Sequence, residues 1–498
     1  MAVLMSVQRT QIYKEFNEED RKKYFNLSKS KVIHHIDTLY YSIYLKNDEV
    51  GNAPVGVIEL IDILEELKRK AQEENEDIYF NMENDILLKL RRFSIYEYCL
   101  GKEGFYDIFI AKTIPNDNTP RIVVQLRSIG LWTQGEQALI QESYDFIKKL
   151  LSSVDVEIFE CKENRIDYAF HTNAIQSPYK FFNDDILSNN LSTSFGIYSK
   201  VGRKNNKQLT VEYLSLGNRK SNNLFFRSYN KVREVIEENY KEFFLEYWFN
   251  LGLINLYDYE VYTYAYKEKR YDSIEWGKLE FYINHGKDSN LKGILISKLR
   301  DRKNIKIDEV RQLLKGVMPE PTLIMNIEFQ TMRKFYSSSD EFIDYLTFRS
   351  DITDDPLVRL FQIIDNRKIF LDYLTTSTVA FKKDNGEYMD FWKRVQTCKT
   401  EKIKDLKLKR KYKRNINKEM LLRKIKSSLA TLSLYEGNYD TDINIDFSLL
   451  TNILNDNTFN GEKYIDDEYV RIKDKKKKAL NSILKKNDNS SPSNENDN

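Results

Sequence analysis

The spacing of apolar and polar positions predicts strands and helices through the first 290 residues. Residues 32–45 are rich in β-branched and aromatic side chains and indicate a strand, whereas residues 55–74 have apolar positions at helical spacing and indicate a helix. The same criteria predict a strand pair at about 91–114 joined by Gly101 and Gly104, strands at 121–128, 156–173, 208–218 and 277–286, a helix at 137–153, and a strand running into a helix at 224–235. From about residue 290 onward the apolar spacing becomes helical.

This order of elements favours an α+β domain built on an antiparallel sheet. Strands separated by short turns, without regular alternation of strand and helix, argue against a doubly wound fold. We therefore expect a polar N-terminal arm at residues 1–31, an α+β catalytic domain at 32–290, a mostly helical C-terminal region at 291–484 and a disordered, low-complexity tail at 485–498.

Composition narrows the class of protein. The chain has 498 residues, enough for two or three domains, and its apolar runs are too short to span a membrane. The N-terminus lacks the order of a signal peptide, and the three cysteines lie far apart without a C-x-x-C pair. These features predict a cytoplasmic protein in a reducing compartment, with no membrane partner.

Charge is nearly balanced over the whole chain but not locally. The formal net charge is +2, from 78 basic and 76 acidic residues. Residues 399–426 carry 13 Lys or Arg against 3 Asp or Glu, which indicates either a solvated helix face or a surface that contacts phosphates. The size of the excess favours DNA, and the expected contacts are Lys409, Arg410, Lys411, Lys413 and Arg414.

The four histidines argue against a histidine metal site. His34 and His35 are adjacent and would point to opposite faces of a strand, whereas His171 and His285 are isolated. A hard divalent ion would therefore need carboxylate ligands. Three of the predicted strands each place a carboxylate on their polar face: Asp167, Glu212 and Glu280. Taken alone, such alternation of acids and bases is more often a solvated face.

Tyr229 has a cation two positions away on each side, Arg227 and Lys231. On a strand these three side chains project to one side, and the cations favour the phenolate over the phenol. A tyrosine in that setting could attack a phosphodiester. The alternative is an ordinary strand tyrosine beside two surface cations, in a chain with 33 tyrosines.

Three blocks around these residues resemble a known family. The run at 212–234 is similar to the signature of the Rep_trans family, the rolling-circle replication initiators of Gram-positive plasmids. It matches at Gly217, Arg219, Ser221, Arg227, Tyr229, Lys231 and Glu234. The upstream strand RIDYAFH matches at Arg165 and Asp167, with His171 in place of the family's second aspartate, and the downstream run GKLEFYI matches at Glu280, with Lys278 in place of arginine. The resemblance covers roughly residues 90–290.

The resemblance implies a DNA nicking and joining enzyme. Such initiators resemble the His-hydrophobe-His nucleases in fold but hold Mg²⁺ or Mn²⁺ with carboxylates, here Asp167, Glu280 and Glu212. Tyr229 would be the nucleophile that becomes 5′-phosphotyrosyl-linked, while Arg227 and Lys231 would neutralise the transition state and lower the tyrosine pKa. Arg219 and Ser221 would contact DNA.

The implied partners are double-stranded origin DNA, the nicked single strand, a host helicase and a polymerase, with a homodimer as a further expectation. Two alternatives remain open: a relaxase of a conjugative element with the same chemistry, and a non-catalytic DNA-binding regulator, which the substitutions at His171 and Lys278 would fit. The abundance of Lys, Asn, Ile and Tyr, which have AT-rich codons, indicates a low-GC Gram-positive bacterium as the source.

Overall fold

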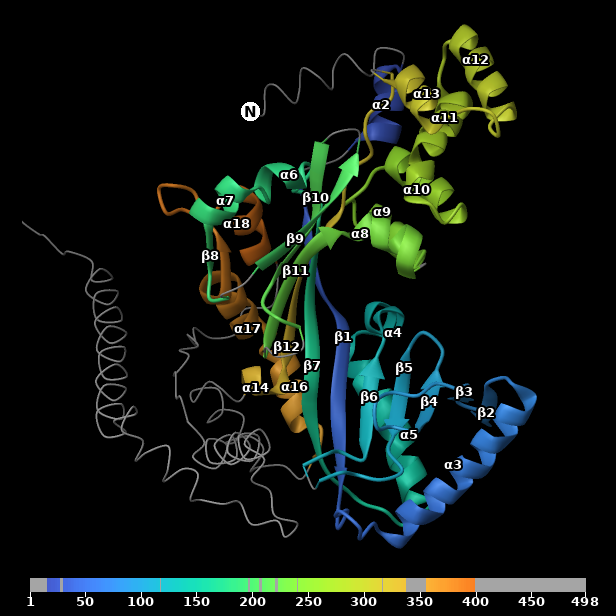
Figure 1. Ribbon diagram of the computed structural model, residues 1–498, viewed down its shortest axis with the longest axis vertical. Helices are drawn as coiled ribbons and strands as arrows, with labels where there is room; N and C mark the ends of the chain where they lie inside the picture. Colours follow the sequence, from blue (N-terminus) through green and yellow to red (C-terminus); the bar gives the residue numbers. More distant parts are fainter. Residues whose placement is uncertain are drawn as a thin grey trace, which may run out of the picture. The chain divides into compact units, whose positions relative to one another are not determined.

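The computed structural model describes most of the chain up to residue 398 (Figure 1). The described residues are 16–26, 30–116, 118–195, 198–205, 208–219, 223–239, 241–315, 317–336 and 355–398. All of them belong to one compact unit, which ends at Lys411. Within this part of the chain, none of the helices has the length and apolar composition needed to cross a membrane.

A large antiparallel sheet organises the unit. Its strands are β1 (Val32–Leu45), β2 (Ile78–Asn81), β3 (Ile86–Lys89), β4 (Tyr98–Lys102), β5 (Tyr106–Ile110), β6 (Ile122–Leu126), β7 (Ile158–Thr172), β9 (Tyr198–Asn205), β10 (Gln208–Leu216), β11 (Leu224–Asn230) and β12 (Met325–Met332). Among the described residues these eleven strands lie in the order β2-β3-β4-β5-β6-β1-β7-β12-β11-β10-β9. A separate pair joins β8 (Leu191–Thr193) to β13 (Val379–Phe381).

The long central strands β1 and β7 divide the sheet into two halves that follow the same path. In the N-terminal half, β1 leads into helix α3 (Val55–Glu74) and then into a meander whose last strand, β6, returns to pair with β1. In the C-terminal half, β7 leads into short helices α6 (Pro178–Phe181) and α7 (Asp184–Asn189) and then into strands whose last member, β12, returns to pair with β7. The halves therefore repeat one topology, although the sequence shows no repeat of fixed period.

One face of the sheet carries the main hydrophobic core. Strand residues from both halves meet there, such as Leu39 and Ile166 from the central strands and Phe226 from β11. Helices on that face supply the other side of the core, because their apolar positions recur at helical spacing. These helices are α3, α5 (Glu136–Ser152), α16 (Val358–Asp365), α17 (Arg367–Tyr373) and α18 (Asp390–Gln396).

A helical segment separates β11 from β12 in the chain and has a core of its own. Trp248, Val261 and Leu279 are fully buried in it. Its helices are α8 (Lys231–Glu234), a π-helix (Val235–Asn239), α9 (Phe243–Asn250), α10 (Leu256–Lys267), a 3₁₀ turn (Tyr271–Ser273), α11 (Ile274–His285), α12 (Ser289–Arg300) and α13 (Ile307–Leu314), with α2 (Glu18–Phe25) packed against them. Figure 1 shows α9 to α13 gathered beyond one end of the sheet.

Most of the elements predicted before residue 235 are confirmed. The expected strand at 32–45 is β1 and the expected helix at 55–74 is α3, both with the predicted bounds. The other predicted strands correspond to β4, β5, β6, β7 and β10, the helix at 137–153 to α5, and the segment at 224–235 to β11 running into α8. The predicted α+β class with an antiparallel sheet is therefore confirmed.

The strand predicted at 277–286 is wrong, because these residues belong to α11. Eight residues of α11 are buried. They include the charged residues Glu275 and Lys278 as well as Gly277 and the apolar side chains. A helix enclosed on nearly all sides has no polar stripe to mark its period, so a short stretch of it can imitate an alternating strand.

The sheet also continues past the predicted boundary at residue 290. Strand β12 pairs with β7 on one side and with β11 on the other. The boundary therefore falls inside the helical segment and does not separate two domains. The helical spacing expected after residue 290 is confirmed in α12, α13, α16 and α17.

Several predictions fall on residues outside the described part of the chain. They concern the basic run at 399–426 with Lys409, Arg410, Lys411, Lys413 and Arg414, the tail at 485–498, Ser221, and residues 1–15 of the N-terminal arm. They stay predictions.

Candidate active site

The C-terminal half of the sheet presents a polar face opposite the main core. Residues that pair across antiparallel strands point to the same face. Arg227 on β11 pairs with Glu328 on β12, and Tyr229 pairs with Asn326. Strand β12 in turn pairs with β7 so that Asp167 lies on this face. The predicted placement of Arg227 and Tyr229 on one side of their strand is thus confirmed.

The Tyr229 hydroxyl lies among three polar side chains. It donates a hydrogen bond to Glu328 Oε2 at 3.2 Å and accepts one from Asn326 Nδ2 at 2.9 Å. Lys231 Nζ is 3.4 Å from the same oxygen. Asn326 also donates to Glu328 Oε2, at 3.0 Å. These contacts hold the hydroxyl in one position, with a carboxylate as the acceptor of its proton.

Arg227 binds the same carboxylate in a bidentate manner. Its Nε and Nη2 atoms lie 2.9 and 2.7 Å from Glu328 Oε1, and Nη2 lies 2.9 Å from Oε2. The guanidinium carbon is also 5.0 Å from the centre of the Tyr229 ring. Paired guanidinium bonds fix a carboxylate in orientation as well as in charge. Glu328 is therefore held between a permanent cation and the tyrosine.

The prediction that the flanking cations lower the pKa of Tyr229 is wrong in its net effect. Burial raises the pKa of Tyr229 well above its ordinary value, and the nearby Glu328 and Glu234 raise it further. Lys231 and Arg227 act in the predicted direction but do not offset burial. Tyr229 is therefore protonated at neutral pH, and its proton must leave if the oxygen is to act as a nucleophile.

Lys231 supplies a buried positive charge beside the hydroxyl. Its side chain is fully buried and forms an ion pair with Glu234 at 2.6 Å. Burial by itself would lower the pKa of Lys231, but Asp37 and Glu234 raise it well above its ordinary value. Lys231 therefore stays charged at any pH at which the protein would work.

Asp167 is the second carboxylate of the polar face. Arg165, two residues before it on β7, bonds both of its oxygens, at 2.8 and 2.5 Å. Burial raises the pKa of Asp167 to about 6, and the negative charge of Glu328 contributes to that rise, although Arg165 opposes it. Two carboxylates on neighbouring strands thus repel one another at this face.

The residues present fit a divalent ion that takes part of its shell from water and substrate. Mg²⁺ is commonly bound through one or two carboxylates plus substrate phosphates, and Asp167 and Glu328 are two carboxylates whose mutual repulsion a cation would relieve. The described residues contain no group of three His, Cys, Asp or Glu side chains that could hold a metal ion.

Glu280, predicted as a ligand together with Asp167, is not brought to this face. It lies on α11, where it lines a hollow with Tyr264 and Glu268 in the helical segment. Glu328 occupies the strand beside β11 in its place. Glu212, the third predicted ligand, lies in β10 where the register with β9 shifts.

Arg219, predicted to contact DNA, lies at the same polar face. Its Nε atom donates to Gln330 Oε1 at 3.2 Å, and Gln330 pairs with Asp167 across β12 and β7. The residue is exposed. It is therefore open to solvent beside the carboxylates, and its contact with DNA stays a prediction.

The two histidines of β1, His34 and His35, point to opposite faces of the strand, as predicted. His34 stacks near Phe170 on the core side, with ring centroids 4.8 Å apart. His35 lies on the other side, 4.4 Å from the ring of His171. Trp248 donates to His171 Nδ1 at 3.0 Å. The two rings that share a face are thus enclosed by aromatic side chains, and burial lowers the pKa of both.

Sequence reasoning missed Glu328 and Asn326, which complete the tyrosine site. The signal was present: Met325, Ile327 and Phe329 alternate with polar residues, as expected for a strand with one buried face. The run is only eight residues long and stands among segments with helical spacing, so it did not stand out.

Comparison with known proteins adds a distant structural likeness. No model of a known protein family matches the chain, and no curated protein matches its sequence. Among solved structures, the chain is similar to the rolling circle replication initiator protein from Geobacillus stearothermophilus, with 11% identity and a TM-score of 0.32, over 73% of this chain and 97% of that one. A TM-score of 0.32 is too low to establish a common fold, so the function proposed next depends on the chain's own residues.

Proposed function

We propose that this protein is a DNA nicking and joining enzyme that initiates rolling-circle replication, with Tyr229 as the nucleophile. The observation that carries the proposal is the Tyr229 hydroxyl held between Glu328, Asn326 and the buried cation Lys231. The resemblance of residues 212–234 to the Rep_trans signature supports the choice of substrate.

In the proposed reaction the Tyr229 oxygen attacks the phosphorus of one phosphodiester in the origin. A bond forms between that oxygen and phosphorus, and the bond from phosphorus to the 3′ oxygen breaks. The product is a 5′-phosphotyrosyl link and a free 3′-hydroxyl, whose proton comes from water. Because the link preserves the free energy of the broken bond, the reverse attack rejoins the strand without ATP.

Glu328 is proposed as the general base. Tyr229 is protonated in the resting site, and Glu328 Oε2 already accepts its hydrogen bond at 3.2 Å. A base within hydrogen-bond reach typically contributes a factor of about 10²–10⁴ in rate. Arg227 and Lys231 would then stabilise the negative charge that grows on the phosphate in the transition state.

The dependence on Mg²⁺ or Mn²⁺ is part of the proposal. Asp167 and Glu328 are the residues that would hold the ion, and when bound it would polarise the scissile phosphate. Chelation with EDTA is expected to stop nicking while single-stranded DNA still binds, and addition of excess Mg²⁺ is expected to restore nicking. Nicking that persists in EDTA would contradict the metal dependence alone.

The test of the nucleophile compares two neighbouring tyrosines. Tyr213 pairs with Tyr229 across β10 and β11, and their rings lie 6.4 Å apart. Tyr229→Phe is expected to abolish nicking of a supercoiled plasmid carrying the DNA that flanks the gene, and also the covalent adduct seen on a denaturing gel. Tyr213→Phe is the matched control and should keep both.

Two results would overturn the proposal. One is nicking and adduct formation by Tyr229→Phe, and the other is DNA binding by the unaltered protein with no cleavage under any divalent ion. The second result would favour a non-catalytic regulator. A conjugative relaxase would use the same residues, so transfer of a plasmid between cells, measured with and without Tyr229→Phe, distinguishes that role.

A further inference from the structure

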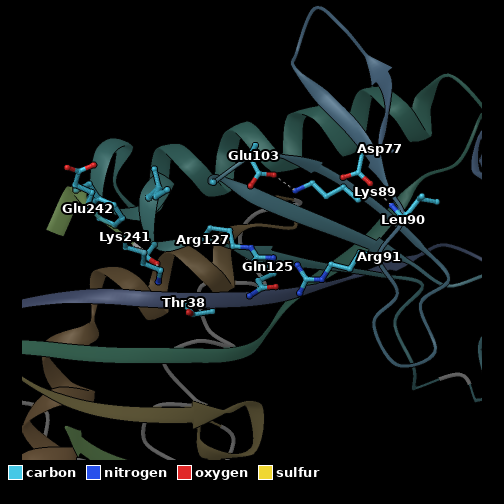
Figure 2. Close-up of a pocket in the computed structure, with 14 residues that line it drawn as sticks. Thr38, Asp77, Lys89, Leu90, Arg91, Glu103, Gln125, Arg127, Lys241 and Glu242 are labelled. Carbon is cyan, nitrogen blue, oxygen red and sulfur yellow. Dashed lines mark hydrogen bonds and ion pairs between the residues drawn. The ribbon is translucent and has the colours of Figure 1, made fainter. Parts of the chain in front are cut away.

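The N-terminal half of the sheet has a hollow on its polar face, which we name the Arg127 hollow. Its volume is about 810 Å³. It is lined by Thr38 from β1, by Lys89 and Arg91 at the end of β3, by Arg127 after β6, and by Lys241 and Phe243 at the start of α9. Figure 2 shows Lys241, Arg127 and Arg91 one after another along it.

A single buried carboxylate orients three of these cations. Asp107 on β5 is 1% exposed and is bonded by Lys89 at 2.9 Å, by Arg91 at 3.1 Å and by Arg127 Nε at 2.8 Å. Three positive charges therefore meet one negative charge. The exposed Glu103 pairs with Lys89 at 3.0 Å, so these three cations exceed their two carboxylate partners by one positive charge. Each guanidinium has five N–H donors, more than Asp107 can accept.

Three carboxylates among the described residues also line the hollow: Asp77, Glu103 and Glu242. Asp77 accepts the backbone N–H of Leu90 at 2.8 Å, so its oxygens are directed at the end of β3. Figure 2 shows Glu242 next to Lys241 at one end of the row, and Glu103 above Arg127 with its ion pair to Lys89. The row of Lys241, Arg127 and Arg91 supplies cations along the length of the hollow.

The Arg127 hollow lies beside the tyrosine site on the same face of the sheet. Tyr40 on β1 pairs with Gln125, which lines the hollow, and also with Arg165, the partner of Asp167. Thr38, at the edge of the hollow, pairs directly with Asp167.

Charge links the two regions as well. Lys241 lines the hollow, donates to Ser128 Oγ at 2.6 Å, and interacts electrostatically with Lys231 and Glu328 of the tyrosine site. Burial lowers the pKa of Lys241, and the nearby Asp37 opposes that shift. A chain of phosphates that starts at Tyr229 would meet cations all along this path.

We propose that the Arg127 hollow binds the backbone of single-stranded DNA next to the strand held at Tyr229. The inference rests on the proposed function, because it assigns a second contact for the same substrate. Proteins that bind single strands without sequence preference use a positive groove with aromatic side chains for the bases, and Phe243 lines this hollow beside the cations. A hollow of this size holds a drug-sized ligand, and about two nucleotides are of that size.

The experiment measures binding to a labelled 30-nucleotide oligothymidine over a range of salt concentrations, in the Tyr229→Phe background. Arg91→Gln keeps a hydrogen-bond donor near Asp107 but removes the charge. Loss of one phosphate contact is expected to weaken binding several-fold and to reduce the slope of log affinity against log salt by about 0.7. Arg127→Gln should act in the same direction.

Arg311→Gln is the matched control. The side chain of Arg311 is 43% exposed and that of Arg91 is 44% exposed, and both pair with carboxylates, but Arg311 lies on α13 in the helical segment. It is expected to change neither affinity nor slope. Arg91→Lys, which keeps the charge, should restore the slope, and thermal melting checks that each variant is folded.

Three outcomes would overturn the inference: an unchanged slope in both Arg91→Gln and Arg127→Gln, an equal effect of Arg311→Gln, or an equal loss of affinity for a 30-base-pair duplex.

The outcome of this binding experiment is independent of the nicking test. Binding in the Tyr229→Phe background requires no chemistry, so the hollow can fail while Tyr229 still nicks, and a changed slope without nicking would count against the proposed function alone.

Discussion

The two halves of the sheet follow the same path but use their polar faces differently. In the C-terminal half, Glu328 is shared among Arg227, Asn326 and the hydroxyl of Tyr229. In the N-terminal half, Asp107 is surrounded by cations, and no tyrosine is among the described residues that line the Arg127 hollow. A carboxylate with a hydroxyl partner can accept a proton, whereas one with three cations can only hold them in place.

The difference is visible in the pKa shifts of two buried acids, Asp167 and Asp107. The pKa of Asp167 is raised to about 6 by burial and by the nearby Glu328. Burial would also raise the pKa of Asp107, but Arg127 and Lys89 outweigh it, and the net direction is down. The acid of one face therefore resists ionisation, whereas the acid of the other face is kept ionised by the cations around it. We expect the first face to react and the second to bind.

The largest expected effect is on the nicking rate, and it distinguishes Glu328 from Asp107. Glu328→Gln keeps the shape of the side chain but removes the acceptor for the Tyr229 proton, so the single-turnover nicking rate should fall by about 10²–10⁴. Asp107→Asn should leave the rate at saturating DNA nearly unchanged. Equal losses of rate in the two variants would contradict the assignment of reaction to the C-terminal half and of binding to the N-terminal half.

A second prediction concerns stability, for which Asp107 should matter although it matters little for the nicking rate. Asp107→Leu leaves three cations without their buried partner, of which Lys89 is itself largely buried. Breaking a buried ion pair by removing one partner costs about 3–5 kcal/mol, and urea unfolding should show a loss of that order. Glu103→Gln, which removes an exposed partner of the same lysine, is the control and should change the unfolding midpoint little.

The pH dependence of stability should have opposite signs in the two halves. Between about pH 4 and pH 6, folded Asp167 keeps a proton that the unfolded chain releases, so its contribution to the free energy of unfolding falls as pH rises. Relative to the unaltered protein, Asp167→Asn should therefore gain up to about 2–3 kcal/mol from pH 4 to pH 7. Urea unfolding at both pH values measures this change.

Asp107 supplies the matching measurement. Because its folded pKa is lowered, its contribution is present above the ordinary pKa of an aspartate and is lost as pH falls through the lowered value. Asp107→Asn should therefore lose stability, relative to the unaltered protein, as pH rises from the lowered pKa to about pH 4, and the difference should stay nearly constant from there to pH 7. If the free energy of unfolding, relative to the unaltered protein, changes with pH in the same direction in both variants, Asp167 and Asp107 do not have opposite electrostatic environments.

The smallest expected effect distinguishes geometry from charge. Arg227→Lys keeps the charge but loses the paired bonds to Glu328, so nicking should slow by about tenfold, or roughly 1.4 kcal/mol in activation free energy. Arg91→Lys in the Arg127 hollow should leave both nicking and the salt dependence of binding unchanged. If lysine is tolerated equally at both positions, the orientation of Glu328 does not matter for the reaction.

The sequence predicted the elements whose local pattern agrees with their environment. Residues 32–45 and 55–74 each have one periodicity along their whole length, and both were placed with the correct bounds. The faces of β7 and β11 followed from simple alternation, so Asp167, Arg227 and Tyr229 were correctly placed on polar faces.

The failures arose where tertiary packing hides the local pattern. Helix α11 is enclosed by other helices, so Glu280 looked like a strand residue. Glu328 is separated from Tyr229 by the whole helical segment, and no local rule connects two strands so far apart in the chain. The flanking charges of Tyr229 were visible in the sequence, but its burial was not, and burial decides the direction of its pKa shift.

The helical segment between β11 and β12 has a consequence for how the protein acquires its reactivity. Tyr229 and Glu328 are 99 residues apart, so their hydrogen bond is a contact of high order that forms late in folding. A chain still on the ribosome, or one cut within the helical segment, carries the tyrosine without its base. Under the proposed mechanism, the ability to break DNA would therefore be acquired only when β12 has paired with β11.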